Sequence, residues 1–415
     1  MATPLFLVLA TLGAGAPARA APSAAALVRV RDYVATYSTR TTMTAHLMIP
    51  AWARKYNMNC SGCHYPAPPR LNATGIKFKW AGYRMPEEVG EKVDVERIQN
   101  YLAAGAEATY EYEKTEGQPT TTSGFTLPAV TVFYAGPFGK HYGGFLELEH
   151  GPDGGIERIA QFSAVWGKEK SYGGFRFGQM HNFVEWGVAG FDRPVGISTP
   201  SPLEDPLTAA IPFMLGEHAL GVEGYYVAGQ NRLSAQVLNG ITPEGELAGP
   251  DVDTRKDFLV TDQILTDSAG SGIQAMGYYG TLVGLDTLSP TLASHFWRAG
   301  VSANKIYKGW EALGGVVIGK DFDLPATAAE DKGLGYWVSG QYTFPKSSLT
   351  LFGRFEFLDP NTDVADDANR RFVGGFVLPI NLPQYLRWAL EYRLDRPQGG
   401  APKTSNITTQ FLLNF

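Results

Sequence analysis

Residues 351–357 read LFGRFEF, and this alternation of side chains sets the architecture expected for most of the chain. Successive side chains of a strand point to opposite faces, so a period of two gives one apolar face and one polar face. The same alternation recurs from about residue 100 onward, for example at residues 106–112, 145–149 and 172–178. We therefore expect an all-β structure for this part of the chain.

The spacing of these segments favours a membrane barrel over a soluble sandwich. Each segment is about 10 residues long, which suits a tilted membrane-spanning strand. The links alternate between long ones, such as residues 180–214, and tight ones, such as residues 229–230. Long loops on one side and short turns on the other are typical of outer-membrane barrels. About sixteen segments can be counted, beginning near residues 103, 124, 141, 156, 172, 215, 231, 257, 272, 293, 309, 333, 348, 370, 384 and 404.

The sequence thus predicts a 16-stranded antiparallel transmembrane β-barrel over residues 96–415, in contact with outer-membrane lipid. Large apolar side chains should face the lipid, and polar side chains should line the lumen. The long loops, including residues 180–214, should face outside. The chain ends on alternating Phe411, Leu413 and Phe415, as many outer-membrane barrels end on an aromatic residue.

The N-terminus predicts secretion. Residues 5–10 are apolar and residues 18–20 read ARA, which is typical of a signal peptide over residues 1–20 with an A-x-A cleavage site. No later apolar stretch reaches the roughly 20 residues that a transmembrane helix needs. The net charge of -6 disfavours nucleic acid as a partner. We expect the protein in the bacterial outer membrane.

The segment before the barrel, residues 21–95, contains Cys60-Ser61-Gly62-Cys63-His64. This is the C-x-x-C-H motif of c-type haem attachment. Cys60 and Cys63 can form thioethers with the two vinyl groups of one porphyrin, and His64 can ligate the iron. A disulfide or a redox pair is the alternative, but a redox C-x-x-C should open a helix after a strand, which these flanks do not predict. We expect one covalent haem c, in a segment that plugs or caps the barrel.

A six-coordinate haem needs a second axial ligand, and Met85 is the favoured candidate because it follows the motif as distal methionines often do. Phe78, Trp80 and Tyr83 are expected to shield the porphyrin, with ordinary core packing as the alternative. The other candidates for the distal ligand are His46, Met48, Met58, Met180 and His181.

Residues 49–64, which read IPAWARKYNMNCSGCH, together with Leu71, Gly75, residues 77–79 and residues 82–83, resemble the fused monohaem cytochrome–porins of outer membranes. The chain departs from that pattern at Trp52, Thr74 and Ile76. The family is best known for iron(II) oxidases, although related proteins occur in organisms not known to oxidise iron. The resemblance implies that Cys60 and Cys63 anchor the haem and that His64 is its proximal ligand.

Three functions remain open at this point. The favoured one is electron transfer from extracellular Fe(II), or another extracellular donor, to a periplasmic cytochrome or other electron carrier. This protein would be an oxidoreductase of the iron(II) oxidase type, or else an electron-transfer protein without an enzymatic role. The alternatives are outward electron transfer to extracellular metals, and a diffusion porin with a structural haem. Carboxylates suit Fe(II) as ligands, and loop acids are found at Asp251, Asp253, Asp359, Asp363, Asp366 and Asp367.

Overall fold

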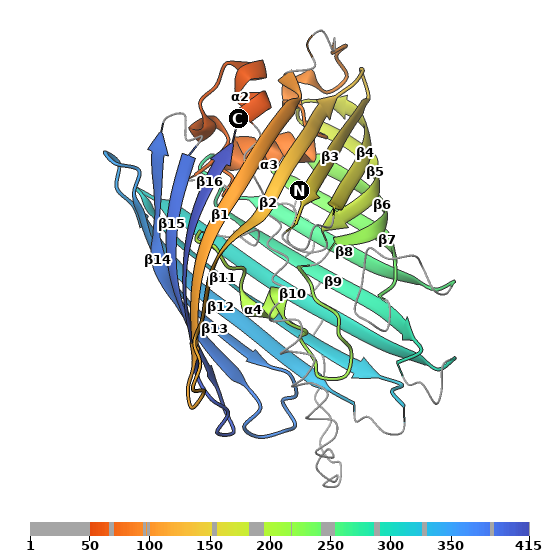
Figure 1. Ribbon diagram of the computed structural model, residues 1–415. Coiled ribbons are helices and arrows are strands. Elements are labelled where there is room, and N and C mark those ends of the chain that lie inside the picture. Colours follow the sequence, from red (N-terminus) through yellow and green to blue (C-terminus); the bar gives the residue numbers. More distant parts are fainter. Residues whose placement is uncertain are drawn as a thin grey trace.

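The protein is a closed barrel of sixteen antiparallel strands, each paired with its neighbours in sequence and closed by β1 against β16 (Figure 1). The computed structural model describes residues 50–65, 70–93, 97, 100–151, 156–181, 195–216, 218–241, 254–285, 291–325, 330–381 and 386–414. The predicted signal peptide, Asp251, Asp253 and Phe415 lie outside these residues. Among the described helices, none is both long and apolar enough to span a bilayer.

The strands begin within three residues of the positions expected from the alternation, so the predicted 16-stranded barrel is confirmed. They are β1 (Leu102–Thr115), β2 (Thr122–Pro137), β3 (Tyr142–His150), β4 (Ile156–Lys168), β5 (Ser171–His181), β6 (His218–Ala228), β7 (Asn231–Asn239), β8 (Lys256–Leu265), β9 (Gly272–Val283), β10 (Ala293–Tyr307), β11 (Trp310–Phe322), β12 (Lys332–Thr343), β13 (Thr350–Asp359), β14 (Asn369–Asn381), β15 (Leu386–Pro397) and β16 (Thr404–Asn414).

The two ends of the barrel differ in the length of their connections. At one end Gly229 and Gln230 join β6 to β7, and Lys308 and Gly309 join β10 to β11. The start of β1 and the end of β16 lie at this same end, because Gly105 pairs with Asn414. Short turns face the periplasm in outer-membrane barrels. We therefore call this the short-turn, periplasmic end and the other the long-loop, external end.

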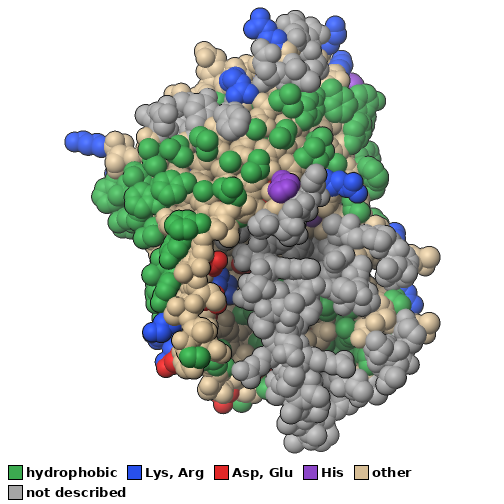
Figure 2. All heavy atoms as spheres, in the orientation of Figure 1, with side chains coloured by type: hydrophobic (Ala, Val, Ile, Leu, Met, Phe, Trp, Pro, Cys, Tyr) green, Lys and Arg blue, Asp and Glu red, His purple; other side chains and the backbone are tan. Residues whose placement is uncertain are grey.

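The outside of the barrel is apolar, and Figure 2 shows hydrophobic side chains gathered over the strands. A closed barrel satisfies its backbone hydrogen bonds without water, so this surface can face lipid. The predicted outer-membrane location follows from it. The lipid-facing side chains include Phe175, Phe177, Leu233, Phe258, Val260, Val301, Val338, Tyr392, Ile407 and Phe411, all exposed in the isolated chain.

The inside of the barrel is filled. Two segments enter the lumen, and they share one buried apolar cluster with the inward faces of β4 to β13. Trp337 and Tyr278 of the wall belong to that cluster, as do Trp80 and Phe213 of the two segments. The expectation that polar side chains line the lumen is therefore incomplete for these strands, because apolar side chains face inward among polar ones such as Glu223 and Gln263. Buried polar side chains also line β13 to β16 and β1, namely Arg354, Glu356, Arg387, Glu391, Gln410 and Glu107.

The first of these is the plug segment, which we define as the described residues between 50 and 93. It contains the helices α2 (Pro50–Tyr56) and α3 (Ala73–Trp80) and the short 3-10 turns η1 (Cys60–Gly62) and η2 (Pro86–Glu88). In Figure 1 α2 and α3 lie at one end of the barrel beside the C-terminus, which is the short-turn end. The described residues of this segment therefore lie at the short-turn mouth of the barrel.

The second is the inward segment, residues 195–216, in the connection between β5 and β6. It contains the helix α4 (Ser201–Glu204), which packs on β12 and β13 inside the barrel (Figure 1). The expectation that this loop lies outside is wrong for these residues. They fold inward because Leu203, Leu207 and Ile211 join the buried cluster and wall carboxylates accept their backbone N–H groups.

Candidate haem-attachment site

The C-x-x-C-H motif forms one tight helical turn. The N–H groups of Cys63 and His64 both donate to the carbonyl of Cys60, at 3.1 and 2.9 Å. This turn sets the two thiols three residues apart on one coil of backbone, with the imidazole directly after them. Cys60 and Cys63 are half-buried and are not joined by a disulfide. The spacing needed for two thioethers and one axial histidine is therefore present.

The orientation of His64 is fixed through its Nδ1 atom, which lies 3.2 Å from the carbonyl oxygen of Arg70. A carbonyl oxygen only accepts, so Nδ1 carries the proton and Nε2 carries the lone pair. Ligating histidines in metal sites are commonly held in this way by a backbone carbonyl. A short antiparallel bridge between His64 and Leu71 brings Arg70 to this position.

Helix α3 packs directly on the turn. Asn72 caps the helix by accepting from the Gly75 N–H, and its own amide donates to the carbonyls of Ser61 and Gly62. The Asn72 N–H donates to the carbonyl oxygen of Cys63 at 2.9 Å. A Cβ on Gly75 would collide with the carbonyl oxygen of Cys63, so only glycine allows this approach.

The cysteines have the electrostatics of protonated thiols. Burial raises the pKa of both, and that of Cys63 reaches about 11. Redox-active and zinc-binding cysteines need the thiolate and are found where the pKa is lowered. The turn also follows a helix rather than a strand. Both observations disfavour the redox-pair alternative, and the donor set Cys60, Cys63 and His64 fits a covalent c-type haem.

The distal ligand is not assigned by the described contacts. Met85 is half-buried at the start of η2, where its N–H donates to Glu88 at 3.0 Å. No described hydrogen bond connects Met85 with His64. Met58 lies against the turn itself, because its methyl group would touch a Cβ on Gly62. The side chains of Met180 and His181, and all of His46 and Met48, lie outside what the structure describes.

The aromatic residues expected around the porphyrin separate into two groups. Phe78 and Tyr83 pack with Trp52, at centroid distances of 4.6 and 5.6 Å from its ring. Trp80 instead points into the lumen, where it is fully buried in the apolar cluster and donates to Gln263 at 3.0 Å. Trp80 therefore packs in the core of the barrel, which was the alternative to shielding the porphyrin.

Side chains of the plug segment bind the barrel at many points around the short-turn end. Sequence reasoning missed the most buried of these, the ion pair between Arg70 and Glu311, because nothing in the motif marks a partner on β11. Other bonds run from Trp52 to the Ala135 carbonyl, from Arg54 to the Leu102 carbonyl, from Tyr83 to Gln161, and from Arg84 to the carbonyls of Lys140 and Tyr142.

The acidic loop between β13 and β14 does not assemble a metal site. Asp363 forms an exposed ion pair with Lys332 at 3.0 Å, and Asp359 accepts from the N–H of Asn361. Among the described residues, no three His, Cys, Asp or Glu side chains are grouped as metal ligands. The hypothesis that these acids bind Fe(II) therefore gains no support from their arrangement.

Solved outer-membrane porins have a similar fold. An anion-selective porin from Comamonas acidovorans matches with a TM-score of 0.54 and 10% identity, over 76% of this chain and 98% of that chain. OmpF of Salmonella typhi, in complex with daunomycin, matches with a TM-score of 0.55 and 11% identity, over 75% and 97%. OmpT of Vibrio cholerae, folded in vitro, matches with a TM-score of 0.53 and 13% identity, over 76% and 97%.

These likenesses show the fold alone. No protein-family profile and no curated protein matches the chain. The structure defines a porin-like outer-membrane barrel of sixteen strands. Its plug segment carries a C-x-x-C-H turn at the short-turn mouth.

Proposed function

We propose that the chain is an outer-membrane c-type cytochrome that carries electrons across the outer membrane. The observation that carries the proposal is the Cys60–His64 turn, with two thiols at thioether spacing and a histidine whose Nδ1 faces a carbonyl. A haem bound there would supply one-electron chemistry. Cys60 and Cys63 would hold it, and His64 would offer Nε2 to the iron.

The position of the plug segment suggests which partner meets the site directly. The turn lies at the short-turn end, which faces the periplasm, so a periplasmic cytochrome or other carrier can approach it. The donor on the other side is proposed to be Fe(II), on the resemblance to cytochrome–porins. Its electron enters from the long-loop end and passes through a lumen that both segments fill.

The first experiment asks whether haem is attached. The chain is expressed with the cytochrome c maturation machinery, and denaturing gels are stained for haem while the intact mass is measured. We expect the mass of one haem, reduced to none in the double variant Cys60→Ala/Cys63→Ala. A wild-type mass without haem contradicts the proposal.

The second experiment asks for the direction of transfer. Oxidised protein in liposomes is mixed with Fe(II) on the long-loop side, and the Soret band is followed by stopped flow. Reduction within seconds supports iron oxidation. If the protein is not reduced by Fe(II) but the reduced protein passes electrons to external Fe(III), outward transfer is the function.

The alternative is a diffusion porin, which the likeness to solved porins favours. The filled lumen counts against it, because Glu223, Arg298 and Glu356 of the wall are buried rather than open to water. Swelling of liposomes in small sugars tests the alternative. Swelling as fast as with an open porin of similar size would support diffusion, and we expect much slower swelling.

A further inference from the structure

The plug segment and the barrel wall meet in one fully buried ion pair. Arg70 Nη2 donates to Glu311 Oε1 at 2.6 Å, and Arg70 Nε lies 3.2 Å from the same oxygen. Side-chain exposure is 1% for Arg70 and 0% for Glu311. Burying two charges carries a large desolvation penalty, which only good geometry and further hydrogen bonds offset. A pair of this kind fixes position more than it adds stability.

Glu311 is also held in place by side chains of the barrel wall, independently of the plug segment. Asn304 of β10 donates to its Oε1 at 2.6 Å, and Gln341 of β12 donates to its Oε2. Asn304 is oriented in turn by the Gly272 N–H, which donates to its Oδ1 at 2.8 Å. The carboxylate is thus a rigid acceptor, built from three neighbouring strands and aimed at the plug segment.

The main chain of Arg70 lies on the other side of this contact, against the haem ligand. Its carbonyl oxygen accepts from the Tyr65 N–H at 3.0 Å and from His64 Nδ1 at 3.2 Å. Two restraints set the position of this carbonyl. The guanidinium of Arg70 is clamped at the barrel wall, and the next residue, Leu71, forms a short bridge with His64.

We infer that Glu311 is a positioning residue for the haem, acting through Arg70 to orient His64. The inference rests on the proposed function, since it concerns a ligand of the haem proposed there. Donation from Nδ1 raises the basicity of a ligating imidazole and favours the oxidised iron. A barrel residue more than two hundred positions away in sequence would therefore help to set the reduction potential.

The test is Glu311→Gln, which keeps the side-chain shape and removes the charge. We expect the reduction potential to rise, with the equilibrium for one-electron reduction changing by about tenfold, or ~59 mV. The electron paramagnetic resonance spectrum of the ferric form should show altered g values. The double variant Arg70→Gln/Glu311→Gln, in which two amides can pair without charge, should recover most of the wild-type spectrum and potential.

Glu356→Gln is the matched control. Glu356 is an equally buried wall carboxylate that pairs with Arg354 at 2.5 Å and binds the inward segment, not the plug segment. We expect its haem spectrum and potential to match the wild type. Arg70→Lys serves if Glu311→Gln does not fold, because lysine keeps the charge but cannot make the forked contact.

The outcomes separate the two proposals. Absence of haem from the wild-type protein overturns the proposed function. Normal haem with an unchanged potential and spectrum in Glu311→Gln or Arg70→Lys, in a correctly folded barrel, overturns the positioning role alone. A potential that shifts equally in Glu356→Gln also overturns it, because the effect would then follow any lost wall charge.

Discussion

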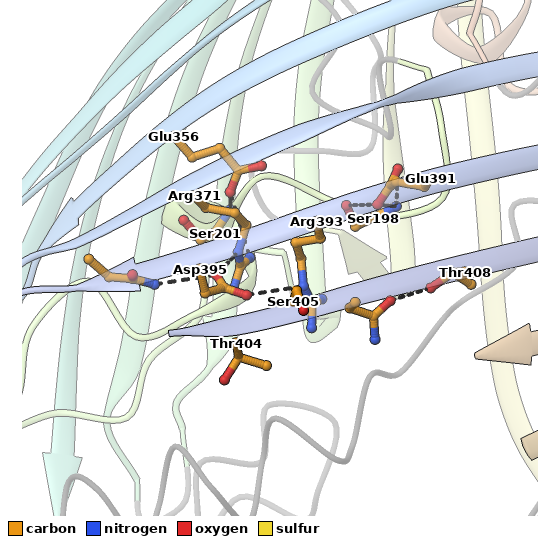
Figure 3. A network of polar contacts seen from close by, with 12 residues as sticks. Ser198, Ser201, Glu356, Arg371, Glu391, Arg393, Asp395, Thr404, Ser405 and Thr408 are labelled. Atoms are coloured by element: carbon orange, nitrogen blue, oxygen red, sulfur yellow. Dashed lines mark hydrogen bonds and ion pairs between the residues drawn. The ribbon is translucent and has the colours of Figure 1, made fainter. Parts of the chain in front are cut away.

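The lumen is filled from both ends, but the two segments are attached in opposite ways. The plug segment uses its own side chains: Arg70, Trp80 and Arg84 reach out to the wall and the turns. The inward segment relies more on its backbone, which donates to carboxylates that the wall supplies, although Thr208 also accepts from Arg298 and Asp205 pairs with Arg371. Glu391 accepts from the N–H group of Ser198, and Figure 3 shows these two residues side by side. It also accepts from the N–H group of Ile197.

This difference indicates which residues determine the attachment of each segment. Attachment of the plug segment depends on a few residues within that segment, so substitutions there should release it. Attachment of the inward segment depends on the wall, because any residue except proline has a backbone N–H to donate. Substitutions of its polar side chains should therefore be tolerated better than substitutions of the wall carboxylates, whereas its buried apolar side chains, such as Leu203, are needed for packing.

The largest effect is expected for Arg70→Ala. It leaves Glu311 buried without its counter-charge, and breaking one partner of a buried pair typically costs about 3–5 kcal/mol. We expect the plug segment to detach while the barrel stays closed. Limited proteolysis of folded protein in detergent should then cut within residues 50–93, and the heat-dependent gel shift should report the intact barrel.

Ser198→Ala is the contrasting change in the inward segment. The Ser198 hydroxyl donates to Glu391, but two backbone N–H groups of the segment still donate to the same carboxylate. We expect no new cleavage within residues 195–216. Equal sensitivity of both variants would remove the distinction between the two modes of attachment.

The second effect concerns close packing inside the plug segment. In Gly75→Ala the new methyl group meets the Cys63 carbonyl, a backbone atom that cannot move aside cheaply. Overpacking of this kind typically costs about 1–3 kcal/mol. We expect less haem attached per chain, measured as the ratio of haem absorbance to protein, and a lower melting temperature of the plug segment.

Gly62→Ala is the matched control for Gly75→Ala. Its methyl group would meet the flexible end of Met58, which can move to another rotamer. Haem content close to wild type is expected there. A loss of haem as large in Gly62→Ala as in Gly75→Ala would show that the turn tolerates no added atom, wherever its neighbour lies.

The third effect tests the wall carboxylates. Glu391→Ala leaves the N–H groups of Ile197 and Ser198 without their acceptor inside the barrel, and each unsatisfied buried group costs about 1–3 kcal/mol. We expect residues 195–216 to loosen and small solutes to pass more freely. Liposome swelling should be faster than for the wild type and for Ser198→Ala. Unchanged swelling would show that apolar packing holds the segment without Glu391.

The barrel was predictable because strand alternation is a local property. Each of the sixteen segments carries its own period of two, as in residues 351–357, and the order of the pairs follows from the short turns. The Cys60–His64 motif is local in the same way, since its five residues are consecutive, and the haem that it predicts stays a prediction. Neither depends on contacts between distant parts of the chain.

The features that the sequence analysis predicted wrongly or missed depend on contacts between residues far apart in the sequence. The inward course of residues 195–216 requires Glu356 and Asp321, which lie more than a hundred residues further along. The link between Arg70 and Glu311 spans more than two hundred positions. A signal was present for the filled lumen: Trp337 and Leu313 occupy inward positions where an open channel would carry polar residues.

The smallest effect is a pH dependence at the long-loop end. Burial, with the charge of Asp321 next, raises the pKa of Asp331 to about 7, while the Ala210 backbone and Arg298 lower it in part. Asp331 also accepts from Asn361 at 2.8 Å. The folded protein thus holds this proton more tightly than the unfolded chain does, for which the ordinary value of 3.8 applies.

The sign of the effect follows from that difference. The stabilising contribution of Asp331 is fully present below about pH 4 and is lost as the pH rises to about 7. Because water partly screens this group, we expect a change of about 1 kcal/mol rather than the full shift. Asp331→Asn keeps a neutral side chain at every pH, so its thermal unfolding in detergent should depend less on pH between 4 and 8. Asp363→Asn, at an exposed carboxylate paired with Lys332, should keep the wild-type dependence. Unfolding curves of Asp331→Asn that follow the wild type across this range would show that titration of Asp331 does not cause the pH dependence.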